Sequence, residues 1–285
     1  MKALLFVAIA LQVAAVGARV APREAWRLAA RPGWILRIAL AMFVATPLLG
    51  VLLARLLDTL PLLKGAMLVL AISAAAPLLP GKLVKLGIDA AHDTALTVVS
   101  SVLAIGLVPL EARLLAAWFD RDLSIGEGAV ARVLAISFIV PLAVGMLVRV
   151  GFGARVQRAA ERVGLIAGVL LGVLVVALVA AQFATLVTLL RQSAVLVVLF
   201  AAGSLGIGHA IGGPGPEERT SLAIATVTRH PGLALLIAST NFPDRPEAPM
   251  AILTFVAGTA LAAIPYTAWR RWQRLGHRAS PVAAA

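Results

Sequence analysis

The segment Thr220–Asn241 reads TSLAIATVTRHPGLALLIASTN and combines a long apolar run with a charge and a proline near its middle. Its length is sufficient to cross a bilayer, for which about 20 apolar residues are needed. Arg229 is costly at that depth, and Pro231 lacks the N–H that a continuous helix requires. The segment therefore predicts a membrane-spanning helix that is broken near its centre.

The depth of Arg229 follows from its distance to the start of the run. Arg229 lies ten residues after Arg219, and at about 1.5 Å per residue this is about 15 Å, half of a core of about 30 Å. Pro231 frees carbonyls near Val227 and Thr228, which must face protein or a water-filled cavity. Secondary transporters commonly build binding sites from such broken helices. The alternative is a kinked helix whose arginine pairs with a buried partner for packing alone.

The composition is typical of a membrane protein. Of the 285 residues, 61% are hydrophobic and 13% are charged, with a mean hydropathy of +0.99, whereas soluble domains are about 45–50% apolar and about 25% charged. We expect an all-α polytopic fold, a single transmembrane unit over residues 1–285. The net charge of +12 comes from arginines between the apolar runs, which indicates topology signals rather than nucleic-acid binding. Cysteine is absent, so disulfides, thiolate catalysis and cysteine metal sites are excluded.

Nine candidate spans can be placed along the chain, and the third and eighth are interrupted. The first span could instead be a cleaved signal peptide, because Met1-Lys2, an apolar core and Val16-Gly17-Ala18 fit that pattern. The nine spans are Lys2–Val20, Trp34–Leu57, Leu62–Ala90, Thr94–Trp118, Ala129–Val150, Val163–Phe183, Ser193–Gly213, Arg219–Phe242 and Ala248–Trp269.

The charges between the spans predict the orientation in the membrane. Positive loops face the cytoplasm, which places the N-terminus outside and the C-terminus in the cytoplasm, in the plasma membrane or bacterial inner membrane. The first loop carries Arg19, Arg23, Arg27 and Arg31, the fifth Arg155, Arg158 and Arg162, and the tail Arg270, Arg271, Arg274 and Arg278. The fourth loop carries Asp120, Arg121, Asp122 and Glu127, and the eighth Asp244, Arg245 and Glu247.

The positions of the two interrupted spans indicate an inverted repeat. The third and eighth spans are five apart, and an offset of five reverses the direction across the membrane. Spans one to four then match spans six to nine. On this interpretation residues 1–122 form a first repeat that lacks one helix, and residues 123–285 form the second.

The third span contains the second predicted break. Pro77, Pro80 and Gly81 interrupt it, and Lys82 and Lys85 follow on one helix face. These lysines either reach a binding site or lie in a cytoplasmic loop that begins at Pro80-Gly81. In the next span, Thr97 and Ser101 are one turn apart and are candidates to line the same site.

Two motifs carry a resemblance to a known family. Pro77–Gly81 is followed by Lys82-Leu83 and then by Ala95-Leu96-Thr97 and Ser101, while the eighth span contains Ala225–Ala234, with Arg229, His230 and Gly232-Leu233-Ala234. At these breaks the chain resembles the bile acid/sodium symporter family. The resemblance implies a core domain in which two broken helices cross, a panel domain beside it, and transport by alternating access. It also implies that the nine spans are the family's form without its first helix.

The departures from the family's motifs concern its sodium ligands. Where the family has a glutamate, a glutamine and an asparagine in the eighth span, this chain has Ala225, Arg229 and His230. The family's Ser-Asn pair falls on or next to Lys82 and Leu83, so that only the hydroxyls of Thr97 and Ser101 remain. Sodium needs several oxygen ligands, and a guanidinium repels it.

These departures give the hypothesis for function. Arg229, with Lys82, supplies fixed positive charge where relatives bind sodium, and Thr226 and Thr228 add hydroxyls beside the break at Pro231 and Gly232. We expect a secondary transporter of a small organic anion, with sodium coupling in doubt and a proton, carried by His230, as the other candidate coupling ion. No cofactor and no metal site are expected.

Two other classes of protein are alternatives to the transporter. An enzyme is not expected, because no nucleophile motif, metal-ligand spacing or intramembrane acid pair is apparent. A membrane sensor that binds without transport, on the same fold, stays open as the alternative. The expected partners are the small anionic solute and the lipid bilayer, and the sequence does not define the oligomeric state.

Overall fold

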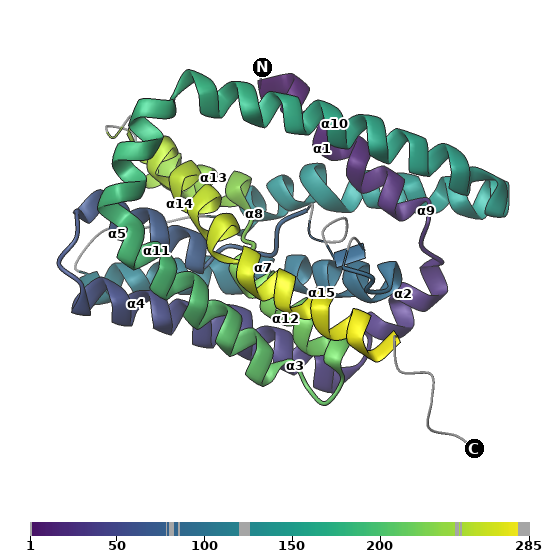
Figure 1. Cartoon of the computed structure of the whole chain (residues 1–285), viewed down its shortest axis with the longest axis horizontal. Coiled ribbons are helices and arrows are strands. Elements are labelled where there is room, and N and C mark those ends of the chain that lie inside the picture. Colours follow the sequence, from purple (N-terminus) through teal and green to yellow (C-terminus); the bar gives the residue numbers. More distant parts are fainter. Residues whose placement is uncertain are drawn as a thin grey trace.

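A computed structural model describes residues 2–77, 79, 83–84, 86–119, 126–242, 245 and 247–278. Within these residues the chain folds into helices, and the β-structure is a single isolated bridge between Ala75 and Arg229. The expected all-α fold is confirmed for this part of the chain. Figure 1 shows the helices, most of which run along the long axis of the molecule.

The first half of the chain contains a π-helical turn, η1, inside its second long helical stretch. Its elements are α1 (Lys2–Gly17), α2 (Pro22–Ala29), α3 (Pro32–Leu40), η1 (Ala41–Ala45), α4 (Thr46–Leu56), α5 (Pro61–Ala71) and α7 (Ala90–Phe119).

The second half contains a second π-helical turn, η2, and a short 3-10 turn, η3. Its elements are α8 (Glu127–Leu134), η2 (Ala135–Ile139), α9 (Val140–Phe152), η3 (Gly153–Val156), α10 (Gln157–Ala181), α11 (Phe183–Ile211), α12 (Pro216–Val227), α13 (Pro231–Asn241), α14 (Ala248–Ala262) and α15 (Ile264–Arg278).

Five helical stretches among the described residues are long and apolar enough to cross a membrane. They correspond to the predicted second, fourth, fifth, seventh and ninth spans. The eighth span consists of two shorter helices, α12 and α13, as predicted, and α5 is the described helix of the third. The count of nine stays a prediction. The five stretches are Pro32–Leu56, Ala90–Trp118, Glu127–Phe152, Phe183–Ile211 and Ala248–Gln273.

Two details differ from the sequence interpretation. The segment expected as the first loop contains the short helix α2, which starts at Pro22 and carries the exposed Trp26; proline is favoured at a helix start because its φ is already helical. Within the ninth span, the helix is interrupted at one residue: α14 ends at Ala262 and α15 begins at Ile264. Some loop residues used for the orientation, Asp120, Arg121, Asp122 and Asp244, lie outside the described residues.

The helices pack in two groups. Helix α1 contacts α9 and α10, and Figure 1 shows α10 along one edge of the molecule with α1 and α9 beside it. The contact is close because a Cβ at Gly145 would meet the backbone of Ala14, and one at Gly17 would meet that of Leu142. In the other group α11 packs against α4, α12 and α14, and α5 packs against α4, α13 and α14. This grouping is compatible with the expected panel and core, whose assignment stays a prediction.

Candidate functional site

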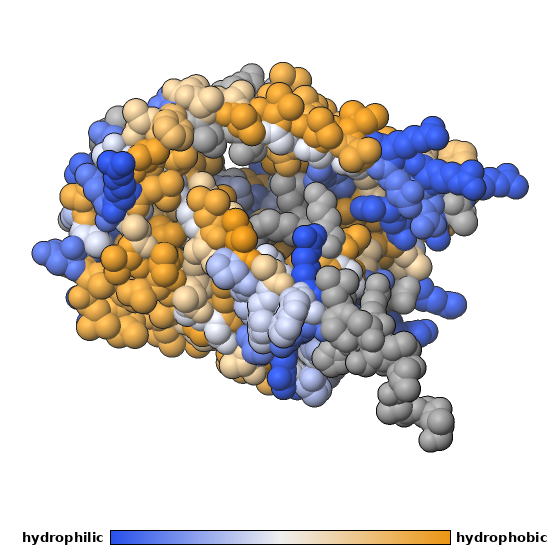
Figure 2. Space-filling view, viewed as in Figure 1, coloured by the Kyte–Doolittle hydropathy of each residue, from blue (hydrophilic) through white to orange (hydrophobic). Residues whose placement is uncertain are grey.

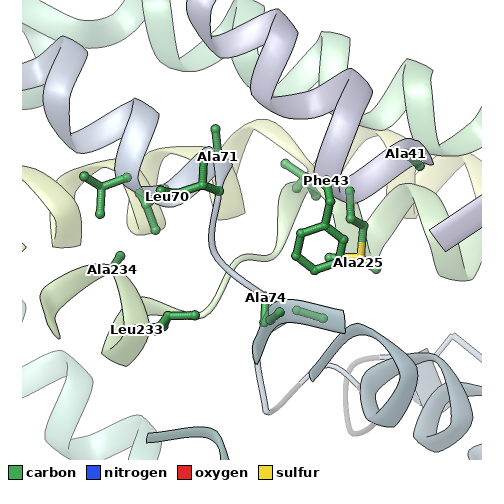
Figure 3. Packing of buried hydrophobic residues seen from close by; sticks show 14 of the residues in the cluster. Ala41, Phe43, Leu70, Ala71, Ala74, Ala225, Leu233 and Ala234 are labelled. Carbon is green, nitrogen blue, oxygen red and sulfur yellow. The ribbon is translucent and has the colours of Figure 1, made fainter. Parts of the chain in front are cut away.

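The two predicted breaks meet at one place in the structure. Helix α12 ends at Val227 and α13 begins at Pro231, while α5 ends at Ala71 and the chain continues in an extended form. The extended segments pair antiparallel: the N–H of Ala76 donates to the carbonyl of Thr228 at 3.0 Å, and that of His230 to the carbonyl of Ala74 at 2.9 Å. Figure 3 shows the chain between Ala71 and Ala74 crossing the link between α12 and α13.

Alanines make the close crossing compatible with a packed interior. Ala74, Ala75 and Ala225 are 0–1% exposed, and their small side chains allow the two backbones to approach each other. Without this pairing, the backbone groups released by the two breaks would lack partners in a region that lipid surrounds. The predicted break at Pro231 is thus confirmed, and its freed carbonyl at Thr228 is satisfied by the other broken segment.

The side chain of Arg229 is buried at the crossing, with 4% of its surface exposed. Its guanidinium donates three hydrogen bonds to backbone carbonyls: Nε to Thr226 at 2.9 Å, Nη1 to Ser73 at 2.7 Å and Nη2 to Met42 at 2.9 Å. These carbonyls come from α12, from the end of α5 and from η1. One cation therefore ties together three elements that are far apart in the sequence.

Each of the three carbonyls is available because the helix around it is irregular. Ser73 lies beyond the last turn of α5, and Thr226 lies in the last turn of α12. Met42 lies in η1, where the π-helical turn changes the hydrogen-bond pattern, and such turns are frequent at functional sites. Carbonyl dipoles orient the guanidinium and lower the cost of its burial, but they leave its net charge in place. The crossing therefore holds a fixed positive charge.

His230 is 3% exposed and is held at both ring nitrogens. Its Nδ1 accepts the N–H of Leu233 at 3.1 Å and so caps the start of α13. Nδ1 therefore carries no proton, and Nε2–H donates to the hydroxyl of Ser137 at 2.9 Å. The Ser137 hydroxyl in turn donates to the carbonyl of Val133 at 2.6 Å. A second proton on His230 would break the cap, so this conformation holds the imidazole neutral and does not support His230 as the proton carrier.

The hydroxyls predicted beside Arg229 have different surroundings. The hydroxyl of Thr226 lies within hydrogen-bond distance of the carbonyls of Ser204, at 2.7 Å, and Ala223, at 2.8 Å. It thereby anchors α12 to α11 and is not directed to a ligand. Thr228 lines a small pocket next to Arg229. At Gly232, a Cβ would approach the ring of His230 to 3.1 Å, which accounts for a glycine in the first turn of α13.

Helix α7 contacts the crossing through Ser100, which is not among the site residues predicted from the sequence. The hydroxyl of Ser100 accepts the N–H of Ala75 at 3.0 Å and so supports the extended segment directly. Thr97 instead donates to the carbonyl of Asp93 in its own helix at 2.9 Å. Ser101 is 1% exposed, and its hydroxyl has no partner among the described residues. Ser100 therefore makes the contact with the break, and a role of Thr97 and Ser101 in lining the site stays a prediction.

The first break is only partly described. Pro77 is buried in a turn directly after the extended segment, as a break residue should be. Pro80, Gly81, Lys82 and Lys85 lie outside the described residues. The predicted role of Lys82 stays a prediction.

A pocket of ≈ 40 Å³ lies next to the crossing, with room for about three water molecules. Arg229 lines this pocket, whereas the three residues that bind its guanidinium do not. The volume of the pocket in this conformation is too small for an organic anion. Three of its lining residues, Thr228, Arg229 and Thr259, are polar, and the rest are Leu70, Phe200, Val227, Val256 and Ala260.

Glu111 is a buried acid that the sequence interpretation did not select. It lies in α7, is 7% exposed, and neither carboxylate oxygen has a hydrogen-bond partner among the described residues. The signal was present in the sequence, since Glu111 stands inside the apolar run Thr94–Trp118, and an acid within a membrane span is by default a functional candidate.

The apolar helices and the broken crossing define an integral membrane protein of the transporter class. The sequence pattern of the sodium bile acid symporter family matches residues 6–189, and the chain belongs to this family. The match includes the first break and ends before the second. A search of curated proteins finds no significant match.

Proposed function

We propose that this protein is a secondary transporter that moves a small organic anion by alternating access, with Arg229 as a built-in cation where relatives bind sodium. The observation that carries the proposal is the buried guanidinium at the crossing of two broken helices. Broken helices at the membrane midplane are where many secondary transporters bind their substrates. A fixed positive charge at such a point favours an anion.

The geometry leaves the guanidinium able to act on an anion. Arginine has five N–H donors, and the hydrogen bonds to Thr226, Ser73 and Met42 use three of them. The adjacent pocket is lined by Thr228, Arg229 and Thr259. In a more open conformation, an anion at the crossing would meet the remaining donors of the guanidinium. At an effective dielectric of 20, a unit charge about 4 Å from the guanidinium gains about 4 kcal/mol.

The same geometry argues against sodium at this place. Sodium requires several oxygen ligands, and the three carbonyls that converge here already bind the guanidinium. A second cation would also be repelled by the arginine. We therefore expect transport that does not require sodium.

Alternating access needs two groups of helices that move relative to each other. We assign α1, α9 and α10 to the panel, and the helices around the crossing to the core. The hydrogen bond from His230 to Ser137 then joins the core to η2, the turn that leads into α9. Figure 2 shows an apolar belt with hydrophilic residues toward the two ends of the molecule, which agrees with a bilayer that surrounds the middle. The N-terminus outside and the C-terminus in the cytoplasm remain our assignment.

The proposal is tested in two steps with the full-length protein. A thermal-shift screen of organic anions first identifies a ligand, with Arg132→Gln as a control, because Arg132 is exposed on α8. Counterflow of the radiolabelled ligand in proteoliposomes then tests transport. Accumulation above the equilibrium level supports the transporter. Binding without counterflow identifies a sensor on the same fold, and the absence of anion binding contradicts the proposal.

A further inference from the structure

The side chain of Glu111 is enclosed in the interior of a membrane helix bundle. It lies eight residues before the end of α7 at Phe119, which is about 12 Å along the helix axis. Its side chain is 7% exposed, and both oxygens are buried without a hydrogen-bond partner in the described part of the chain. The residue is thus away from either end of α7 and shielded from water in this conformation.

Burial of an ionised carboxylate in such surroundings has a high free-energy cost, whereas burial of a neutral carboxylic acid has a much lower one. An ionised carboxylate that is removed from water needs donors or an opposite charge at close range. Arg229 is on a neighbouring element, because its guanidinium binds the Met42 carbonyl in η1 and η1 packs against α7. Its guanidinium, however, is directed to backbone carbonyls, and the ion pair found among the described residues is a different one, between Arg37 and Glu218. The enclosed position therefore suits a carboxyl group that carries a proton.

The other charged groups on the helices packed against α7 do not change this picture. Helices α1, α2, α3, α8 and α12 and the turn η1 contact α7. The charged residues on these elements whose side chains the structure describes are Arg23 and Arg27 on α2, Arg37 on α3, Glu127 and Arg132 on α8, and Glu217, Glu218 and Arg219 on α12.

The helix is weakened next to this acid. Pro109 lies inside α7, two residues before Glu111. Proline removes the hydrogen bond to the carbonyl four residues earlier, here Ile105, and favours a local bend. A bend at this point can open or close access of water to the carboxyl group as the helices move. This region therefore combines an enclosed acid, a weakened helix beside it and a fixed cation on a neighbouring element.

We propose that Glu111 is the binding site of a coupling proton, so that this transporter moves its anion together with a proton. The inference rests on the proposed function and adds the coupling ion to it. Glu111 accepts a proton in a conformation in which the bend at Pro109 gives water access to its carboxyl group. In the conformation described here it is buried as a neutral acid.

The positive charge of Arg229 couples the binding of the anion to the binding of the proton at Glu111. With no anion present, the positive charge of Arg229 favours the carboxylate and so favours release of the proton. An anion bound at Arg229 cancels that effect, and the proton is held. Proton and anion therefore strengthen each other's binding, and this coupling is reciprocal by thermodynamic necessity. The pair would load and unload together, which is the requirement for symport.

The first experiment measures the proton itself and needs no substrate. Infrared spectra of the purified protein in liposomes are recorded over a pH titration for the wild type, for Glu111→Gln and for Glu127→Gln. Glu127 is an exposed acid at the start of α8, which makes it the matched control. We expect a carbonyl band of a protonated carboxylic acid at neutral pH, lost in Glu111→Gln and kept in Glu127→Gln. A band that survives in Glu111→Gln, or no band in the wild type, overturns the inference.

The second experiment uses the anion identified by the thermal-shift screen. Uptake into proteoliposomes is driven by an inward proton gradient, and Glu111→Gln should lose this stimulation while it still exchanges anion for anion. Gradient-driven uptake that is equal in the wild type and the variant contradicts the proton site and leaves the transporter intact. If the infrared band depends on Glu111 but no anion is transported, the proton site is supported and the proposed transport function is contradicted. The isosteric glutamine is expected to preserve the fold, which a matching melting temperature checks.

Discussion

Substitutions of Arg229 separate its charge from its hydrogen bonds. Arg229→Lys keeps the positive charge but loses the planar group that reaches three carbonyls at once. Arg229→Gln loses the charge but keeps an amide that can donate two hydrogen bonds. Arg229→Ala loses both. If the positive charge binds the anion, anion affinity should depend on whether the variant keeps that charge. If Arg229 only stabilises the crossing, anion affinity should fall in proportion to the loss of folding stability.

The size of the effects can be worked out from the contacts. Each of the three bonds, at 2.7–2.9 Å, joins a charged donor to a buried carbonyl and is worth about 1.5–3 kcal/mol. Removing a buried charge relieves several kcal/mol of desolvation. The net destabilisation of Arg229→Ala is therefore about 2–5 kcal/mol. For the anion, losing even half of an attraction of about 4 kcal/mol weakens binding by more than about tenfold.

The assay combines melting temperature in detergent with affinity for the identified anion. We expect Arg229→Lys to bind the anion more tightly than Arg229→Gln, even where the two variants are equally destabilised. Arg132→Gln, an exposed substitution, should match the wild type in both measurements. The reasoning is refuted if affinity falls in parallel with stability across the series, because Arg229 then serves packing alone.

Two further predictions concern packing. Ser137→Ala removes the acceptor of the His230 ring and should lower stability by about 0.5–1.5 kcal/mol and change the rate of anion exchange; an unchanged rate would argue against a core–panel contact at this bond. Gly145→Val forces a side chain into the backbone of Ala14 and should cost about 3 kcal/mol, measured as a lower melting temperature. Gly151→Val is the control in the same helix, because nothing lies within 4 Å of a Cβ there; equal losses would contradict the close α1–α9 contact.

The break between α12 and α13 was predictable because a proline interrupts a helix whatever its tertiary surroundings. Pro231 has no N–H to donate to a helical hydrogen bond, and the ten residues from Arg219 place Arg229 near the middle of the membrane. Both the interruption and the burial of the arginine therefore follow from the sequence. The partners of Arg229 do not follow. Two of its three carbonyls, at Met42 and Ser73, come from distant segments, and a π-helical turn such as η1 has no sequence signature that marks it.

The contacts of α7 show the limit of motif transfer. Thr97 and Ser101 were predicted from their one-turn spacing and matched the family's motif, yet Ser100 supports the crossing, because neighbouring residues on a helix face different partners. Glu111 was visible as an acid in an apolar run. Its lack of partners was not, because only the packed structure shows which donors are out of reach.

The most direct test of the built-in cation is the sodium dependence of transport. Initial uptake of the identified anion is measured in sodium medium and in choline medium at equal ionic strength, for the wild type and for Arg229→Gln. The account predicts equal wild-type uptake in both media and a deep loss in the variant. A strict sodium requirement in the wild type would contradict it.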